Sequence, residues 1–220
     1  MASGTCAICG ADVGLLTSLY RTADNRSLCG ECANKKWGDF PFSEYTLEEY
    51  YIFLNQMEQG RNLYESLFKN RINLKQFNAS NPLKGLFKKS NDEGVRRYGV
   101  NGLGLWAVED FGMVLIRDLG SLAGFIPKET DIFYFAYRYS EIVSYKYVRE
   151  RVGETDSDDG TVVEGIKITF SGAHIPRVRL VSTGVKAEYN KFDEYFKNIV
   201  GSNMSEWDRR ADEALRSVGR

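Results

Sequence analysis

The four cysteines restrict this chain more than any other feature of its sequence. They form two C-x2-C pairs near the N-terminus of the 220 residues, with nineteen residues between the pairs: Cys6, Cys9, Cys29 and Cys32. Two residues between ligands allow a tight turn whose sulfurs occupy neighbouring corners of a tetrahedron around one ion. Because paired cysteines at this spacing are typical of zinc sites, we predict that the four residues bind one structural zinc ion.

The predicted zinc site leaves no position for a substrate. Four protein ligands fill the tetrahedral shell, whereas a catalytic zinc keeps one position open for water. The alternatives are two disulfides or four unliganded thiols. The sequence has no apolar stretch of roughly 18 residues that could span a membrane, and it does not begin with the pattern of a signal peptide. We therefore expect a cytoplasmic protein, and a reducing compartment disfavours disulfides.

The cysteines define a small N-terminal module, residues 1–40. Gly10 and Gly30 suit the tight turns around the two pairs. Apolar residues on both sides of the segment 23–25 predict a short hairpin between the pairs, and residues 33–36 predict a short helix after Cys32. Forty residues bury too little surface to fold alone, so metal binding has to contribute on the order of 10 kcal/mol of folding free energy.

A helical connector is predicted next, within residues 43–99. Thr46 and Glu49 have the spacing of a capping box, and apolar residues recur at helical spacing after them. Gly60 interrupts this pattern, which indicates either a kinked helix or two helices, the last ending near Asn70. Residues 71–99 contain proline and glycine and few apolar repeats, and we expect them to form a linker.

From about residue 100 the apolar spacing becomes that of β-strands. The predicted strands are 103–108, 113–117, 131–137, 142–152, 162–170 and 177–182. An amphipathic helix should close this antiparallel sheet, with an apolar stripe formed by Phe192, Tyr195, Phe196, Ile199 and Val200. A last helix, starting at Ser205, would occupy a loosely attached tail, residues 202–220. The sequence thus predicts an α+β protein whose strands form a curved sheet or barrel over residues 100–201.

Six or seven antiparallel strands followed by one closing helix resemble the pleckstrin-homology (PH) superfold. More specifically, the chain resembles a poorly characterised family of bacterial and phage proteins with a four-cysteine zinc ribbon, a helical connector and a PH-like domain. The segments that carry the resemblance are CAICG at 6–10, GLL at 14–16, LCGECA at 28–33 and SEIVSY at 140–145. The resemblance implies the zinc ribbon and the PH-like domain, and it brings no known activity with it.

Three motifs could suggest catalysis or ligand binding, and each has a simpler explanation. His174 is the single histidine, but it lies in a predicted turn with no nucleophile indicated nearby. Gly102, Gly104 and Ala107 match the letters of a dinucleotide fingerprint, yet the pattern places them inside a strand instead of between a strand and a helix. The acidic residues of 154–159 lack the glycine and glutamate spacing of a calcium loop, and we expect a solvated hairpin tip there.

One basic segment could bind nucleic acid. Its basic residues are Lys84, Lys88, Lys89, Arg96 and Arg97. Such residues can contact phosphates, and the neighbouring Phe87 and Tyr98 could stack on bases. Asp92 and Glu93 dilute the charge, and the formal net charge of the chain is -1, so the alternative is a solvated linker.

A PH-like fold also suggests phosphoinositide binding, which such domains achieve with basic residues in the loop between their first two strands. Glu109 and Asp110 lie between the first two predicted strands of this chain. Two carboxylates would repel a phosphorylated headgroup. We therefore expect no phosphoinositide binding.

The function that the sequence favours is that of a non-enzymatic adaptor. The predicted metal shell is closed, and no catalytic group is indicated. Thirteen tyrosines and thirteen phenylalanines could include exposed anchors for another macromolecule, most plausibly a protein. A nucleic-acid-binding regulator that uses the zinc module and the basic segment is the alternative, and an enzyme with an unfamiliar carboxylate site is a third hypothesis.

Overall fold

The computed structural model divides the chain into two compact units, one of which comprises Met1–Glu58, Leu119–Phe133 and Ala173–Ile175, and the other Gln59–Asp118, Tyr134–Gly172 and Pro176–Arg220. The residues that the structure describes are 4–14, 20–34, 42–71, 94–98, 104–119, 132–152, 161–182, 186–200 and 202–218. Of the helices within these ranges, none combines the length and the apolar character needed to cross a membrane.

Within its described residues, the N-terminal part of the first unit contains two short hairpins and two short helices. Its elements are β1 (Gly4–Thr5), β2 (Asp12–Val13), β3 (Tyr20–Arg21), β4 (Ser27–Leu28), α1 (Gly30–Asn34) and the 3-10 helix η1 (Phe42–Glu44). Strand β1 pairs antiparallel with β2, and β3 pairs antiparallel with β4. The hairpin predicted around residues 23–25 is therefore confirmed. Helix α1 begins at Gly30 and contains Cys32, so the prediction that the helix starts after Cys32 is wrong.

Helix α2 (Leu47–Leu63) continues without a break into a π-helical turn, η2 (Tyr64–Phe68). The predicted capping box is confirmed: the Thr46 N–H donates to Glu49 Oε2 at 2.8 Å, and the Glu49 N–H donates to Thr46 Oγ1 at 3.2 Å. The predicted kink or split at Gly60 is wrong, because the helix runs through this residue. Gly60 packs against strand β8 (Ile132–Arg138), where an added Cβ would lie 1.9 Å from the Tyr134 carbonyl oxygen.

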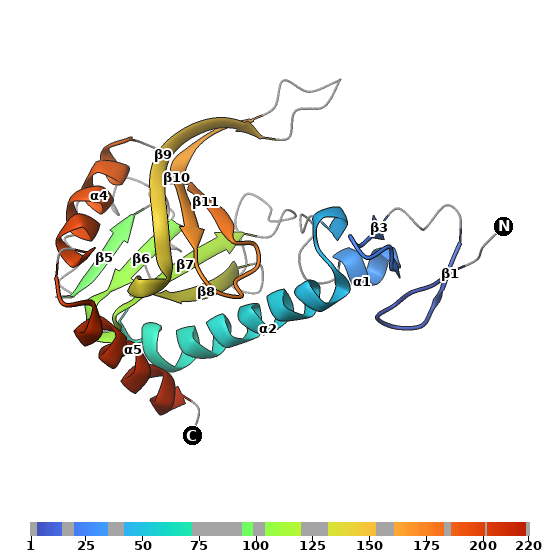
Figure 1. Ribbon diagram of the computed structural model, residues 1–220, viewed down its shortest axis with the longest axis horizontal. Coiled ribbons are helices and arrows are strands. Elements are labelled where there is room, and N and C mark those ends of the chain that lie inside the picture. The colour runs from blue at the N-terminus through green and yellow to red at the C-terminus, as the bar shows by residue number, and fades with distance from the viewer. Residues whose placement is uncertain are drawn as a thin grey trace, which may run out of the picture. The chain divides into compact units, whose positions relative to one another are not determined.

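Two β-sheets form most of the second unit. The four-stranded sheet has the order β5 (Val95–Tyr98), β6 (Gly104–Val108), β7 (Met113–Leu119) and β8, and the three-stranded sheet has the order β11 (Val178–Ser182), β10 (Thr161–Phe170) and β9 (Ile142–Val152). The pairs β5–β6, β6–β7, β9–β10 and β10–β11 are antiparallel. Strands β9 and β10 curve along their length (Figure 1). Among the described strands, no pairing joins the two sheets into a closed barrel.

All six predicted strands are confirmed, and their ends are within two residues of the predicted ends. Strand β5 is a seventh strand, and it lies in the segment 71–99 that was predicted to be a linker. Its residues read VRRY, so two adjacent charges hide the alternation of apolar and polar residues that identifies a half-buried strand.

Two arginines lie in the core of the second unit, surrounded by aromatic rings. The Arg179 guanidinium carbon is 3.5 Å from the centre of the Phe135 ring, and its Nε donates to the Tyr137 hydroxyl at 2.5 Å. Arg117 Nη2 donates to the Tyr134 hydroxyl at 3.4 Å. A planar guanidinium can stack on rings and donate hydrogen bonds at once, which allows a charged side chain to be accommodated inside a sheet protein.

Helix α4 (Lys186–Val200) follows β11 and packs against β5 and β10 of the two sheets (Figure 1). The predicted stripe is buried at Phe192, Phe196 and Ile199. Tyr195 is half-buried and its hydroxyl lies 3.0 Å from that of Tyr139, while Val200 is 57% exposed and lies outside the core. The prediction is thus wrong for Val200, the last residue of the helix.

Helix α5 (Met204–Val218) contacts two 3-10 turns of the second unit, η4 (Glu109–Phe111) and η6 (Tyr139–Glu141). Polar contacts hold it there: Ser140 Oγ donates to Asp208 at 2.5 Å, and Arg210 Nη1 donates to the Glu109 carbonyl at 3.2 Å. The expectation that this helix is loosely attached is wrong, because it relied on apolar burial alone.

Candidate metal centre

The first cysteine pair lies at the tip of the β1–β2 hairpin. The Cys6 N–H donates to the Ala11 carbonyl and the Gly10 N–H donates to the Cys6 carbonyl, both at 2.8 Å. Gly10 has a φ of 73°, in the left-handed region that glycine adopts without strain. These local hydrogen bonds form the tight turn that positions Cys6 and Cys9, as the sequence predicted.

The second pair lies where β4 leads into α1. Cys29 directly follows β4, and Cys32 lies in the first turn of the helix. The Cys32 N–H donates to Cys29 Sγ at 3.4 Å, and the Ala33 N–H donates to the Cys29 carbonyl at 3.0 Å. This pair is thus fixed by the start of a helix, which turns both sulfurs to the same side.

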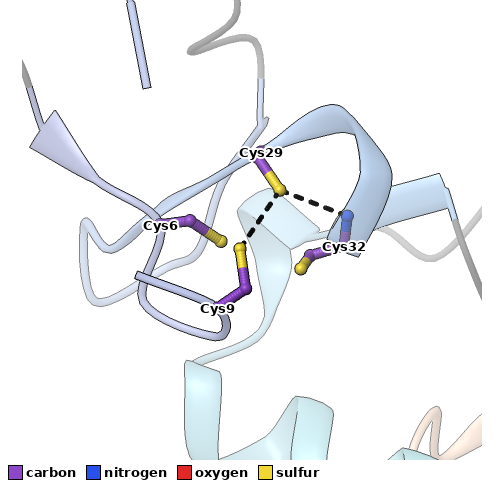
Figure 2. Close-up of side chains that lie close together, drawn as sticks. All are labelled: Cys6, Cys9, Cys29 and Cys32. Atoms are coloured by element: carbon purple, nitrogen blue, oxygen red, sulfur yellow. Dashed lines mark hydrogen bonds between the residues drawn. The ribbon is translucent and has the colours of Figure 1, made fainter. Parts of the chain in front are cut away.

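The two pairs meet because the first hairpin contacts the second. The Ala7 N–H, inside the first pair, donates to the Ser27 carbonyl of β4 at 2.9 Å. As a result the four sulfurs lie within 4.8 Å of one another and point toward a common centre (Figure 2). Cys9 Sγ and Cys29 Sγ are 3.7 Å apart. Bonds of about 2.3 Å to a tetrahedral ion place two ligand sulfurs about 3.8 Å apart, so the group could hold one metal ion.

The side chains of the site differ in exposure. Cys6 is buried, with 2% of its surface accessible, whereas Cys9 is exposed and Cys29 and Cys32 are half-buried. All four are free thiols, and no disulfide links them. The site therefore lies at the surface of the first unit with one ligand in its interior.

The surroundings of the site shift the pKa values of Cys6 and Cys32 in opposite directions. Burial raises the pKa of Cys6, but hydrogen bonds from the backbone N–H groups of Cys29, Cys9 and Ile8 outweigh it and lower this pKa to about 6. Burial raises the pKa of Cys32 to about 12, with further contributions from hydrogen bonds to the other cysteine side chains and from the charge on Cys6. The lowered pKa favours a thiolate at Cys6, whereas burial first, and the charge of Cys6 to a smaller extent, disfavour one at Cys32. A bound cation removes this mutual repulsion, which is the condition for four thiolate ligands.

Tyr50 of helix α2 also contacts the site. Its hydroxyl donates to the Cys32 carbonyl at 3.4 Å, and its ring is 4.9 Å from that of Phe42. Burial, followed by the negative charge of Cys32, raises the pKa of Tyr50 to about 12. No sequence pattern indicated Tyr50, because eighteen positions separate it from Cys32 and no local motif includes both residues.

His174 lies in a turn, as predicted, and contacts Gln56. Gln56 Nε2 is 3.2 Å from His174 Nδ1, and it donates to the Ala173 carbonyl at 3.1 Å. Gln56 Oε1 accepts the Ile175 N–H at 3.1 Å. The glutamine side chain therefore forms hydrogen bonds with the backbone carbonyl before the histidine and the backbone N–H after it, as the backbone of a neighbouring β-strand would.

The other predicted motifs fall partly outside the described residues. Gly104 begins strand β6 and Ala107 lies within it, in agreement with a strand and not a dinucleotide-binding turn. Gly102 and the acidic residues of 154–159 lie outside the described residues. Within the described ranges, the cysteine cluster is the sole group of three or more possible metal ligands.

The basic segment is described only at its end. Lys84, Lys88 and Lys89 lie outside the described residues, and Arg96 and Arg97 belong to strand β5. Arg96 Nε is 3.3 Å from Glu109 Oε1, and its guanidinium carbon is 5.0 Å from the centre of the Tyr195 ring. Arg96 is therefore engaged within the second unit.

The prediction against phosphoinositide binding relied on Glu109 and Asp110, which do not lie between the first two strands of the four-stranded sheet. Because β5 precedes β6, residues Glu109–Phe111 connect the second and third strands of the four-stranded sheet. Asp110 is paired with Arg71 at 2.6 Å. The loop used for that prediction was therefore the wrong one. The segment that does connect β5 and β6 is residues 99–103, and its sequence contains no lysine or arginine to contact a phosphorylated headgroup.

No protein-family model, curated protein or solved structure matches this chain. The chemistry of this protein therefore has to be argued from its own residues, and the four converging sulfurs are the group with the most specific chemistry.

Proposed function

We propose that this chain binds one zinc ion through Cys6, Cys9, Cys29 and Cys32, and that it acts as a non-enzymatic adaptor in which the zinc is structural. The observation that supports this most directly is the convergence of all four sulfurs within 4.8 Å. Four sulfur ligands in a tetrahedral arrangement suit zinc or iron among biological metals, and zinc occupies such closed sites in small structural modules.

The adaptor role is supported by the closed metal shell and by exposed apolar side chains. A closed four-sulfur shell leaves no coordination position for a substrate. Large apolar side chains are exposed in both units, among them Tyr51 at 46% and Val143 at 63%, and such residues can serve as contacts for a protein partner in the cytoplasm.

We propose that the second unit is PH-like. Seven strands in sheets of four and three, followed by helix α4 against both, support this architecture. The order of a cysteine module, a long helix and such a unit also agrees with the bacterial and phage family of zinc-ribbon proteins that the sequence resembles. Fold alone does not identify a ligand, so the proposed activity rests on the cysteine site and not on the PH-like unit.

Elemental analysis of the full chain, purified without chelators, tests the proposed metal site. We expect about one equivalent of zinc per chain, and less than a fifth of an equivalent in the Cys29→Ser variant. Asp12→Ala is the matched control, because Asp12 lies in the same module but offers no sulfur. A wild-type chain that contains iron instead would contradict zinc, and one that contains no metal would contradict the site itself.

The adaptor role has its own test. Chemical crosslinking in the native host, followed by mass spectrometry, should recover a partner with the wild-type chain and lose it with Cys29→Ser. Recovery of nothing above background with either chain would contradict the adaptor role. Binding to nucleic acid that weakens steeply with salt, and that is lost when Lys84, Lys88 and Lys89 are changed to Ala, would favour the alternative of a nucleic-acid-binding regulator.

A further inference from the structure

The turn of the β3–β4 hairpin contacts the start of helix α2 directly. Asp24 Oδ1 accepts the Leu47 N–H at 3.1 Å, and the Ala23 N–H donates to the Tyr45 carbonyl at 2.8 Å. Leu47 is the first residue of the helix, where N–H groups have no partner within the helix itself. The hairpin thus supplies one of the hydrogen-bond acceptors that the helix start requires.

The shape of this turn depends on the strand that leads to the metal site. The Arg26 N–H donates to Thr22 Oγ1 at 3.0 Å, and the Thr22 N–H donates to the Arg26 carbonyl at 3.1 Å. Asn25 adopts a φ of 62°, and Arg21 donates to its side chain at 2.7 Å. Only Ser27 and Leu28 of β4 separate the turn from the ligand Cys29, and Leu28 is fully buried.

Tyr50, in the first half of α2, also contacts this region. Tyr50, Phe53 and Met57 form a buried stripe at spacings of three and four residues. Phe42 of η1 covers Tyr50 and is in turn 6.1 Å from the ring of Tyr20 in β3. Because the Tyr50 hydroxyl also donates to the Cys32 carbonyl, Tyr50 links the first half of α2 to both η1 and α1.

The helix cannot replace these contacts with local ones. The capping box between Thr46 and Glu49 stabilises only the first turn. Most of the stability of a helix in a protein comes from packing of its apolar face, and helices fray from their ends. The segment from Leu47 to Met57 is the N-terminal end of α2, and it contains two tyrosines and a phenylalanine, which are weak helix formers.

We infer that the metal centre is a conformational switch for helix α2: with the ion bound, the Asp24 turn and the aromatic contacts hold the first half of the helix, and without the ion this half unfolds. The inference rests on the proposed metal binding and adds a consequence to it. Hydrogen bonds from Thr22 and from the Leu47 N–H, together with the charge of Arg26, lower the pKa of Asp24, so its carboxylate is available as an acceptor at neutral pH.

Hydrogen exchange of the full chain, followed by mass spectrometry, tests this switch. The metal-loaded protein is compared with the same protein after chelation, and metal content is measured in both samples. We expect amides of residues 47–57 to exchange at least tenfold faster after chelation, while those of α4 (Lys186–Val200) keep their rates as an internal reference. Metal loss without a change in residues 47–57 would overturn the inference and leave the metal site intact; a chain that never holds metal would overturn both.

Two variants separate the Asp24 contact from the ion. Metal-loaded Asp24→Ala should keep its zinc but exchange about fivefold faster over residues 47–57, the usual effect of removing a helix cap. Asp24→Asn retains an acceptor and should behave as wild type, as should Asp12→Ala in the other hairpin. Unchanged exchange in zinc-loaded Asp24→Ala would overturn the role of the turn.

Discussion

Gly60 lies inside helix α2, where glycine is an unfavourable residue. Its backbone lies against the Tyr134 carbonyl so closely that a Cβ would approach the oxygen to 1.9 Å. Glycine normally destabilises a helix interior by about 1 kcal/mol relative to alanine. The residue is therefore explained by the close packing of helix on strand, and not by a bend in the helix.

Replacing Gly60 with alanine should destabilise the protein, although the same change favours an isolated helix. Forcing one methyl group into this contact should lower the free energy of unfolding by about 2 kcal/mol, because the Tyr134 carbonyl belongs to strand β8 and cannot move freely. Urea unfolding measures the effect. Asn55→Ala, at an exposed position of the same helix, is the control and should be neutral or slightly stabilising. A Gly60→Ala variant as stable as this control would contradict the close contact.

At the scale of single residues, the sequence predicted that the four cysteines come together but not which residues surround them. The cysteine spacing is a local property, since each pair needs only two intervening residues to form its turn. Asp24 and Tyr50 act over separations of 23 and 18 residues, which no local pattern encodes. Gly60 was interpreted as a helix breaker for the same reason, because the strand that it contacts is more than 70 positions away in the sequence.

At the scale of elements, the strands were predicted from the apolar runs and the glycines between them. Gly112 directly precedes β7, and Gly172 lies in the turn after β10, so both mark the end of an apolar run. Strand β5 is short and is rich in arginine, and its place at the edge of the four-stranded sheet is decided by pairing with β6, which is a tertiary contact. The separation of the strands into two sheets is likewise a property of packing and was not predictable from periodicity.

Helix α5 should lose part of its stabilisation in acid. Hydrogen bonds from Arg209 and then Arg210 lower the pKa of Glu206 from its ordinary value of 4.5 to about 2. A carboxyl group with a lowered pKa in the folded state stabilises that state above pH 4.5, and this contribution disappears as the pH falls toward 2. An NMR titration of the Glu206 carboxyl carbon should therefore have its midpoint near pH 2. A midpoint near 4.5 would show that the two arginine contacts do not persist in solution, and Glu206→Gln serves as the reference that does not titrate.

At the scale of the whole molecule, the two units have different sources of stability. The second unit buries entire strands such as β6 and has a large aromatic core, whereas the cysteine module has two-residue strands and few buried side chains. A large aromatic core can stabilise a domain by itself, whereas a small module with few buried side chains needs a bound metal to fold.

Metal removal should consequently unfold one part of the chain and spare the other. In the Cys29→Ser variant, amide signals from residues 4–34 should collapse into the narrow range of unfolded chains, while those of β9 and β10 should keep their dispersed positions. Two-dimensional NMR of the uniformly labelled full chain would show both effects in one spectrum, with the zinc-loaded wild type as the reference. Loss of dispersion throughout the spectrum would contradict the independence of the second unit.

The hairpin at the first cysteine pair also determines how an ion would be captured. The hydrogen bonds between Cys6, Gly10 and Ala11 lie within the turn of the first pair, so this pair can bind an ion as a bidentate ligand once the turn has formed. Cys29 and Cys32 then bind from the same molecule, at a high effective concentration that outside ligands have to match. Once one pair has bound an ion, the other pair therefore completes the shell in preference to a free ligand, and a chelator in solution has to overcome this advantage.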